Sequence, residues 1–101
     1  MKSFAERMRE DTRLAILRLL KESRGYMLNS SQVHMGLSML HIPCTRAEVI
    51  EDLRFLADNG LVRMEPIADI SGLYGITMTY AGKEVVEGVQ TVVGVSTPAP
   101  R

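Results

Sequence analysis

The chain has 101 residues, of which 46% are hydrophobic and 24% are charged, so it is long enough for one globular domain and does not have a disordered composition. Its 12 basic and 12 acidic residues cancel, which argues against strong nonspecific attraction of the whole surface to nucleic acid but allows a local basic patch. No apolar run approaches the roughly 20 residues that span a bilayer, and a single cysteine, Cys44, excludes an internal disulfide. We therefore expect a cytoplasmic protein that does not enter a membrane.

Three helices are predicted in the first 60 residues. The segment "DTRLAILRLLKESRG" predicts the body of a first helix, which begins near Ser3 and is stopped by Gly25. The segment "NSSQVHMGLSML" predicts a short second helix, for which Asn29 supplies the N-cap. The segment "TRAEVIEDLRFLADNGLV" predicts a third helix that is capped by Thr45 and ended at Gly60.

The remaining pattern predicts a hairpin and a last helix. The segments "LVRMEPIA" and "LYGITMTY" are strand candidates separated by the turn-forming "DISG", and Pro66 favours an edge strand. "TYAGKEVVEG" then predicts a short helix. This order is that of a winged helix–turn–helix, mainly α with a small two-stranded β-hairpin. We assign residues 1–88 to a winged-helix domain and residues 89–101 to a C-terminal tail that is partly flexible, with "STPAPR" mobile.

Two resemblances refine this assignment. "LRFLADNGLV", followed by a strand and "ITMTYAGKEVVEG", resembles winged-helix regulators of the ArsR and MarR type, in which a Thr-x-x-Gly motif opens the helix after the wing. More narrowly, "RLAILRLLKESRGYMLNSS", "LRFLADNGLV" and "GVQTVVGVSTPAPR" together resemble a family of small proteins of Mu-like phages and prophages, often labelled ArsR-like transcriptional regulators. The second resemblance implies a phage or prophage protein with a winged-helix fold, and it transfers no catalytic or ligand site.

Candidate DNA contacts follow from the expected docking of a winged helix. In the third helix, Arg46 and Arg54 are the best donors to guanine or phosphate when that helix enters the major groove. At the start of the second helix, hydroxyl groups and backbone amides are expected to hold a phosphate. The candidate DNA-binding residues are Ser30, Ser31, Thr45, Arg46, Arg54 and Arg63.

The charges of the third helix leave two classes of function open. The helix has two arginines against four acids, with Glu51 and Asp58 on its expected outward face, and the hairpin tip has no basic residue. The fold and the family resemblance favour a transcriptional regulator that binds double-stranded DNA. The acids, the wing tip without a basic residue and an expected exposed Phe55 favour a non-catalytic protein-interaction module in phage assembly or DNA packaging, with a phage or host protein as partner.

Positive charge is concentrated at the start of the chain. Residues 1–24 hold seven basic and four acidic side chains, whereas residues 25–60 hold two basic and four acidic ones. Three uses of this excess are open: an arm that contacts phosphates, ion pairs within the first helix such as Glu6 with Arg9 and Glu22 with Arg18, and contact with the acidic third helix of another copy.

Self-association is a further expectation. Leu14 and Leu17 fall outside the main apolar face of the first helix, and the valine-rich segment after Gly88 has no place in a minimal winged helix. These two features predict a homodimer that is joined through the first helix and the C-terminal segment.

Nothing in the sequence predicts catalysis, a cofactor or a metal. The "HIPC" segment gives His41 and Cys44 a metal-like spacing, but a closed site needs further ligands, and the Cys-x-Cys pattern of metal sensors is absent. No nucleophile–base set or glycine-rich phosphate loop has a recognisable local motif. We therefore predict a protein that is not an enzyme.

Overall fold

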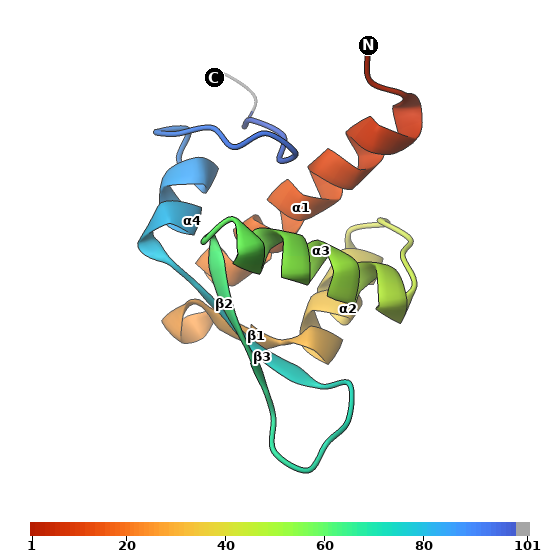
Figure 1. The fold of residues 1–101 in the computed structure, drawn as a ribbon, viewed down its shortest axis with the longest axis vertical. Helices are drawn as coiled ribbons and strands as arrows, with labels where there is room; N and C mark the ends of the chain where they lie inside the picture. The colour runs from red at the N-terminus through yellow and green to blue at the C-terminus, as the bar shows by residue number, and fades with distance from the viewer. Residues whose placement is uncertain (99–101) are drawn as a thin grey trace.

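The structure is a computed structural model and describes residues 1–98. Within these residues the chain forms four α-helices, one 3-10 helix and three strands, so the predicted class of mainly α with a small β-structure is confirmed (Figure 1). In chain order the elements are α1 (Phe4–Glu22), η1 (Arg24–Tyr26), β1 (Met27–Asn29), α2 (Ser30–Met39), α3 (Arg46–Asp58), β2 (Val62–Pro66), β3 (Tyr74–Met78) and α4 (Tyr80–Val86).

The sheet contains one strand more than the predicted hairpin. Strands β2 and β3 form that hairpin, with Met64 paired to Ile76, and β1 pairs antiparallel with the other edge of β3, where Leu28 lies opposite Ile76. The predicted hairpin is therefore present, and the third strand, β1, was not predicted. Three residues are too short to show a strand period, and β1 forms because β3 supplies hydrogen-bonding partners from almost 50 residues away.

The core lies between the helices and the inner face of the sheet. Leu14 and Leu17 are 5% and 0% exposed, so the prediction that they form a second apolar face for a partner was wrong. Helix α1 contacts α2, α3, α4 and β3, and these elements cover it on several sides. The other buried hydrophobic residues are Ile16, Leu20, Val33, Leu37, Val49, Leu53, Leu56, Leu61, Val62, Ile76, Met78, Val85 and Val95.

Local side-chain chemistry fixes the starts of the two central helices, as predicted. Asn29 and Gln32 form a capping box at α2, and Thr45 and Glu48 form another at α3. Helix α1 is capped by the hydroxyl of Ser3, and the helix ends at Glu22, three residues before the predicted stop.

Helices α2, α3 and α4 are each followed, two residues after the last helical residue, by a residue in the left-handed backbone conformation. These residues are His41 (φ 60°), Gly60 (φ 72°) and Gly88 (φ 78°). At each end the next amide bonds back across the last turn, as in Ile42 N–H to the Leu37 carbonyl at 2.9 Å. Glycine adopts this conformation without a steric cost, whereas His41 does not.

The Thr-x-x-Gly motif joins α4 tightly to the end of α3. The Thr79 hydroxyl accepts the N–H of Gly82 at 3.1 Å and donates to the Gly60 carbonyl at 2.7 Å. A Cβ atom at position 82 would overlap the carbonyl oxygen of Leu61. Glycine is therefore required here by close approach of the backbone and not by a special dihedral angle.

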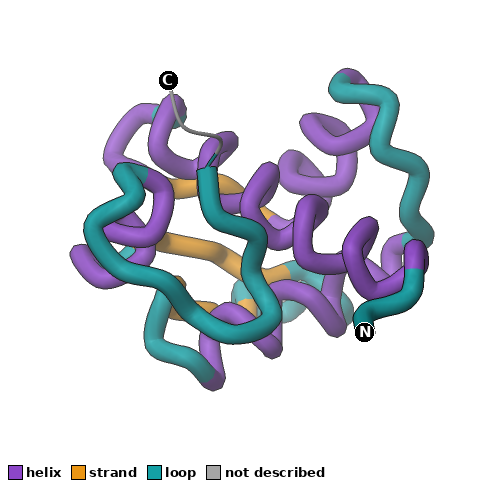
Figure 2. Tube along the Cα trace, turned by 90° about the horizontal axis from the view of Figure 1, so that it is seen from above, coloured by secondary structure: helices purple, strands orange, loops and turns teal. Residues whose placement is uncertain are grey.

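The segment that follows α4 packs on α1 and α3 of its own chain. Val95 is 6% exposed and belongs to the core, and the Ser96 N–H donates to the Glu10 carbonyl at 3.2 Å. Figure 2 shows this loop crossing beside the helices. The sequence predicted that this segment joins two copies of the chain, but the contacts that the structure shows for it lie within one chain. The sequence also predicted that "STPAPR" is mobile, and residues 99–101 of that stretch lie outside the described residues.

Candidate nucleic-acid interface

Helix α3 carries its charges on two separate sides. Asp52 and Glu51 face α1, where both lie within bonding distance of Arg9. Arg54 faces the hairpin, where its Nη2 atom donates to the Tyr74 hydroxyl at 3.1 Å. Arg46 lies on the same half of the helix, roughly 80° from Arg54 around the axis at about 100° per residue. The side that faces the hairpin therefore carries both arginines of α3, although Asp58 lies only about 40° from Arg54 and α3 as a whole is acidic.

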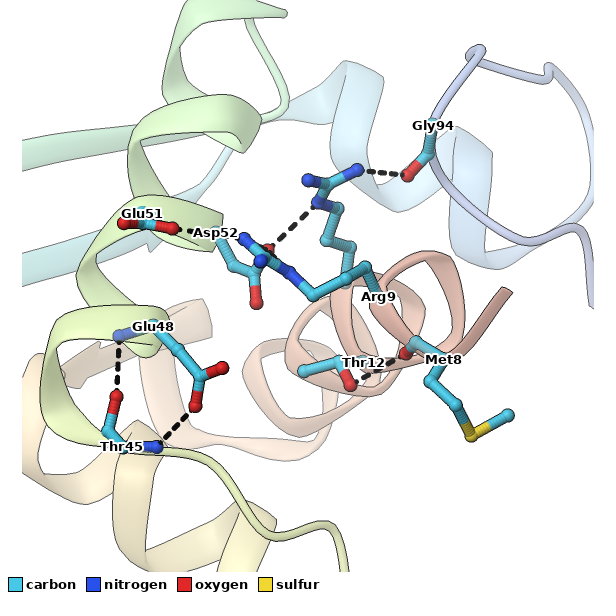
Figure 3. A network of polar contacts seen from close by, with 9 residues as sticks. Met8, Arg9, Thr12, Thr45, Glu48, Glu51, Asp52 and Gly94 are labelled. Carbon is cyan, nitrogen blue, oxygen red and sulfur yellow. Dashed lines mark hydrogen bonds and ion pairs between the residues drawn. The ribbon is translucent and has the colours of Figure 1, made fainter. Parts of the chain in front are cut away.

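Asp52 is the centre of a buried ionic cluster. Its side chain is 1% exposed, and its Oδ1 atom accepts from Arg9 Nη2 at 3.0 Å and from Arg13 Nε at 3.0 Å (Figure 3). Arg13 also donates to the Gly94 carbonyl at 2.9 Å and stacks on the Phe55 ring, with its guanidinium carbon 3.9 Å from the ring centroid. The cluster joins α1, α3 and the C-terminal segment. It also gives the buried Asp52 carboxylate two positively charged partners, without which its burial would cost several kcal/mol.

This cluster overturns two expectations about the basic first helix. Arg9 pairs with Asp52 and Glu51 across the fold and not with Glu6, so the prediction of that intrahelical pair was wrong, and no Glu22–Arg18 pair forms within residues 1–98. The basic first helix does face an acidic third helix, but the contact lies within one chain. Two lysines also pair, Lys2 with Glu10 and Lys21 with Glu87, so that of the seven basic residues among residues 1–24 Arg7, Arg18 and Arg24 have no ion pair within residues 1–98.

The acids of α3 are also less available to a ligand than their number implies. Glu48 turns back on the helix start, where its carboxylate accepts the Thr45 N–H at 2.8 Å. This backbone hydrogen bond, together with the bond to the Thr45 hydroxyl, lowers the pKa of Glu48 below its usual value. Because Asp52 is buried and Glu51 pairs with Arg9, Asp58 is the one acid of α3 that has no side-chain bond within residues 1–98.

An open groove of about 440 Å³ runs along the basic side of α3. Ser31 of α2 stands on one wall, Arg46 and Ile50 of α3 form another, and the hairpin loop from Ile70 to Leu73 closes the third. Arg54 lies one turn beyond Ile50, with its guanidinium 5.4 Å from the Tyr74 ring centroid. The groove therefore combines the Arg46 guanidinium and the start of a helix with a partly apolar floor, and the Arg54 guanidinium lies beyond it, beside Tyr74.

The structure brings three of the six predicted contact residues together and sets the others apart. Ser31 and Arg46 line the groove and Arg54 lies one turn beyond it, whereas Ser30 is 5% exposed and its hydroxyl accepts the Tyr74 N–H at 3.0 Å. That bond holds the hairpin to α2, so Ser30 is structural. The Thr45 hydroxyl is used as the cap of α3.

Arg63 lies on the other face of the sheet. It pairs with Thr77, and both alternate with the inward-facing pair Met64 and Ile76. Phe55, expected to be exposed, is half-buried beneath Arg13 and Gly94, so the argument drawn from its exposure was wrong.

Sequence reasoning missed the buried cluster and the aromatic partner of Arg54. One signal was present, because Arg9 and Arg13 stand four residues apart and therefore share a side of α1. The sequence contains no comparable signal for Tyr74, because its hydroxyl meets Arg54 only once β3 has paired with β2.

A hydrogen bond between His34 and Cys44 connects the middle of α2 to the residue that precedes the N-cap of α3. The His34 ring nitrogen Nε2 lies 2.9 Å from the Cys44 carbonyl oxygen, so the bond is to backbone. Burial raises the pKa of the Cys44 thiol, and the negative charges of Asp52 and Glu48 raise it further. Among residues 1–98, no three His, Cys, Asp or Glu side chains are grouped so as to hold a metal ion. The same residues include no helix with the length and apolar character needed to cross a membrane.

Comparison with known proteins identifies a phage relative. No protein-family model matches the chain, and no solved structure matches it. The chain is 35% identical over 92 residues to a protein of Escherichia phage Mu described as uncharacterized protein gp26, and the match covers 91% of this chain and 92% of the phage protein. This match confirms the expected kinship with Mu-like phage proteins. The chain belongs to the family of the phage Mu protein gp26.

Proposed function

We propose that this protein is a winged-helix protein of phage or prophage origin that binds double-stranded DNA through α3 and regulates transcription. The observation that carries the proposal is the separation of charge on α3, with Arg46 and Arg54 on the side of the hairpin and three of the four acids, Glu48, Glu51 and Asp52, turned toward α1 or the helix start. The succession α1, β1, α2, α3 and a β2–β3 hairpin, with strand order β1-β3-β2, supports the assignment as a winged helix.

In this proposal the side of α3 that faces the hairpin enters the major groove. Arg46 lies in the first turn and Arg54 two turns later, about 12 Å along the axis at 1.5 Å per residue, so the two guanidinium groups reach different phosphates or base edges. The buried state of Asp52 matters here, because a carboxylate already neutralised by two arginines repels an approaching phosphate far less than an exposed one.

The start of α2 adds a second contact. Its first turn holds no acidic residue, and Ser31 stands at the edge of the groove. Backbone amides at a helix start favour a phosphate because of their free N–H groups and the helix dipole. Helix α3 offers less at its own start, since the Glu48 carboxylate already occupies the cap.

Salt-dependent binding to a duplex of arbitrary sequence tests the proposal. We expect measurable affinity at ~50 mM salt that falls steeply toward ~200 mM, as release of counterions requires. The double variant Arg46→Ala/Arg54→Ala should bind more weakly, with the salt slope reduced by up to about two units at 0.9 per phosphate contact. The variant Asp58→Lys should bind more tightly, because it removes the acid that remains available on α3.

A matched control removes the same charge from other surfaces. Arg24→Ala/Arg63→Ala deletes two exposed arginines, one in η1 and one on the far face of the sheet, and should leave affinity and salt slope close to those of the parent. Absence of binding at ~50 mM salt, or equal losses in the two double variants, would show that α3 does not hold DNA.

A second candidate function is a protein-interaction module in phage assembly or DNA packaging. The observation that favours it is the apolar part of the same groove, where Ile50 lies near Ile70, which is 52% exposed, and where residues 67–73 of the hairpin include no basic side chain. In that case Ile70→Asp disrupts a complex with a phage or host protein, while the arginine variants leave the response to DNA unchanged.

A further inference from the structure

One face of α1 carries alternating charges that the rest of the chain leaves exposed. The face is a narrow stripe. Its charged residues are separated by four, seven and four positions, so at 100° per residue their directions around the helix axis differ by no more than about 60°. All of its charged members are exposed, and in order along the helix they are Arg7, Asp11, Arg18 and Glu22.

These charges have almost no partners in their own chain. Within residues 1–98, Arg7, Arg18 and Glu22 form no ion pair, and Asp11 accepts one hydrogen bond, from the Ser96 hydroxyl. The opposite side of α1 is where Arg9 faces α3. The stripe therefore points away from the candidate DNA interface.

A groove of about 560 Å³ follows the stripe and gives it an apolar centre. Its floor contains Leu14, Ala15 and Leu19 of α1. One wall is formed by Leu40, which is 52% exposed, and the other by the Ser96–Thr97 segment. Charged side chains thus border a partly apolar channel that runs along a helix.

We infer that this stripe is the contact surface for a second copy of the chain, with the two α1 helices packed antiparallel across it. When Leu14 of one copy lies opposite Ala15 of the other, Arg7 faces Glu22 of the second copy and Asp11 faces Arg18 of the second copy. The twofold symmetry repeats both contacts, so one register makes four ion pairs.

The order of the charges along the stripe favours a second copy of the chain as the partner that binds there. Positive, negative, positive, negative is complementary to itself only when one strip is reversed, as in an isologous contact between antiparallel helices. A parallel arrangement would place each charge against its own kind. Nucleic acid is disfavoured on the same surface because Asp11 and Glu22 repel phosphate.

This interface replaces the dimer predicted from sequence with a different contact. Leu17 belongs to the core and cannot join two copies, and Leu14 contributes only the floor of the groove. The interface does not rest on DNA binding. It does leave the arginine side of α3 accessible in both copies, since the stripe and α3 lie on opposite sides of α1.

Sedimentation velocity of the full chain tests the interface with charge reversals. The parent should form a dimer at ~50 mM salt and dissociate more readily at ~500 mM, where screening shortens to a few ångströms. Arg18→Asp and Asp11→Arg should each raise the dimer Kd by about tenfold or more, because each places like charges opposite one another at two symmetry-related positions. An equimolar mixture of the two variants should form a heterodimer, since opposite charges then face each other again.

A control and a charge-swapped variant separate the contact from general charge or stability effects. Arg24→Asp makes the same charge change off the stripe and should dimerise like the parent. The double variant Asp11→Arg/Arg18→Asp keeps the composition, restores all facing pairs and should also dimerise. A parent that stays monomeric at ~300 µM and low salt, equal effects of Arg18→Asp and Arg24→Asp, or failure of the mixture to form a heterodimer would each overturn the inference.

Discussion

Replacing Asp52 by alanine should be among the most damaging single changes in the chain. Its carboxylate is 1% exposed and accepts hydrogen bonds from Arg9 and Arg13, which come from a helix about forty residues away in sequence. Removal of the carboxylate leaves two guanidinium groups without their main partner. Arg13 loses more than Arg9 because its side chain is only 15% exposed, although it keeps its hydrogen bond to the Gly94 carbonyl.

The expected loss is about 2–4 kcal/mol in the free energy of unfolding. Breaking a buried ion pair by deleting one partner costs about 3–5 kcal/mol. The cost is lower here because Arg9 is 37% exposed and can turn to water or to Glu51. A protein of this size is stable by about 5–15 kcal/mol, so the change consumes a large share of the total.

Urea unfolding followed by far-ultraviolet circular dichroism measures the loss, and Glu51→Gln is the matched control on the same helix. Glu51 is 67% exposed and its contact with Arg9 is 3.4 Å long, so its loss should cost less than about 1 kcal/mol. Equal and small effects of Asp52→Ala and Glu51→Gln would refute the reasoning that the buried carboxylate joins α1 to α3.

Three further predictions concern the helix ends and the cysteine. Gly82→Ala should cost about 1–3 kcal/mol in urea unfolding despite the higher helix propensity of alanine, because its Cβ meets the Leu61 carbonyl; a gain in stability would contradict this close approach. His41→Gly should add about 0.5–1 kcal/mol to the free energy of unfolding, since φ is 60° at this position, whereas a loss would mean that the imidazole has a stabilising contact. Alkylation of Cys44 by iodoacetamide should be slower at pH 8 than that of a model thiol, with the pH midpoint of the rate shifted upward, because burial raises the thiol pKa; a rate equal to that of the model thiol would argue against burial.

Sequence reasoning succeeded where the signal is local. The caps at Asn29 and Thr45 were readable because each capping box spans only four residues. The turn at Gly60 was readable for the same reason, whereas the equivalent end of α2 at His41 was not, because histidine rarely adopts left-handed backbone.

Long-range pairing accounts for what was missed. Counting the acids of α3 indicated a helix unsuited to DNA, but the count could not show that Asp52 is neutralised by Arg9 and Arg13 from another helix. Strand β1 is stabilised by β3 and not by its own three residues. Arg63 of β2 and Tyr74 of β3 lie on opposite faces of the hairpin, which is apparent only when the register of the two strands is known.

Amide chemical-shift mapping with a short DNA duplex at ~50 mM salt tests the proposed role of α3 most directly. The largest changes should fall on the first turn of α2 around Ser31, on the side of α3 that carries Arg46 and Arg54, and on residues 67–73 of the hairpin. The stripe of α1 and the segment around Gly94 should change little. Absence of shifts, or shifts confined to α1 and the C-terminal segment, would contradict the proposal that α3 holds DNA.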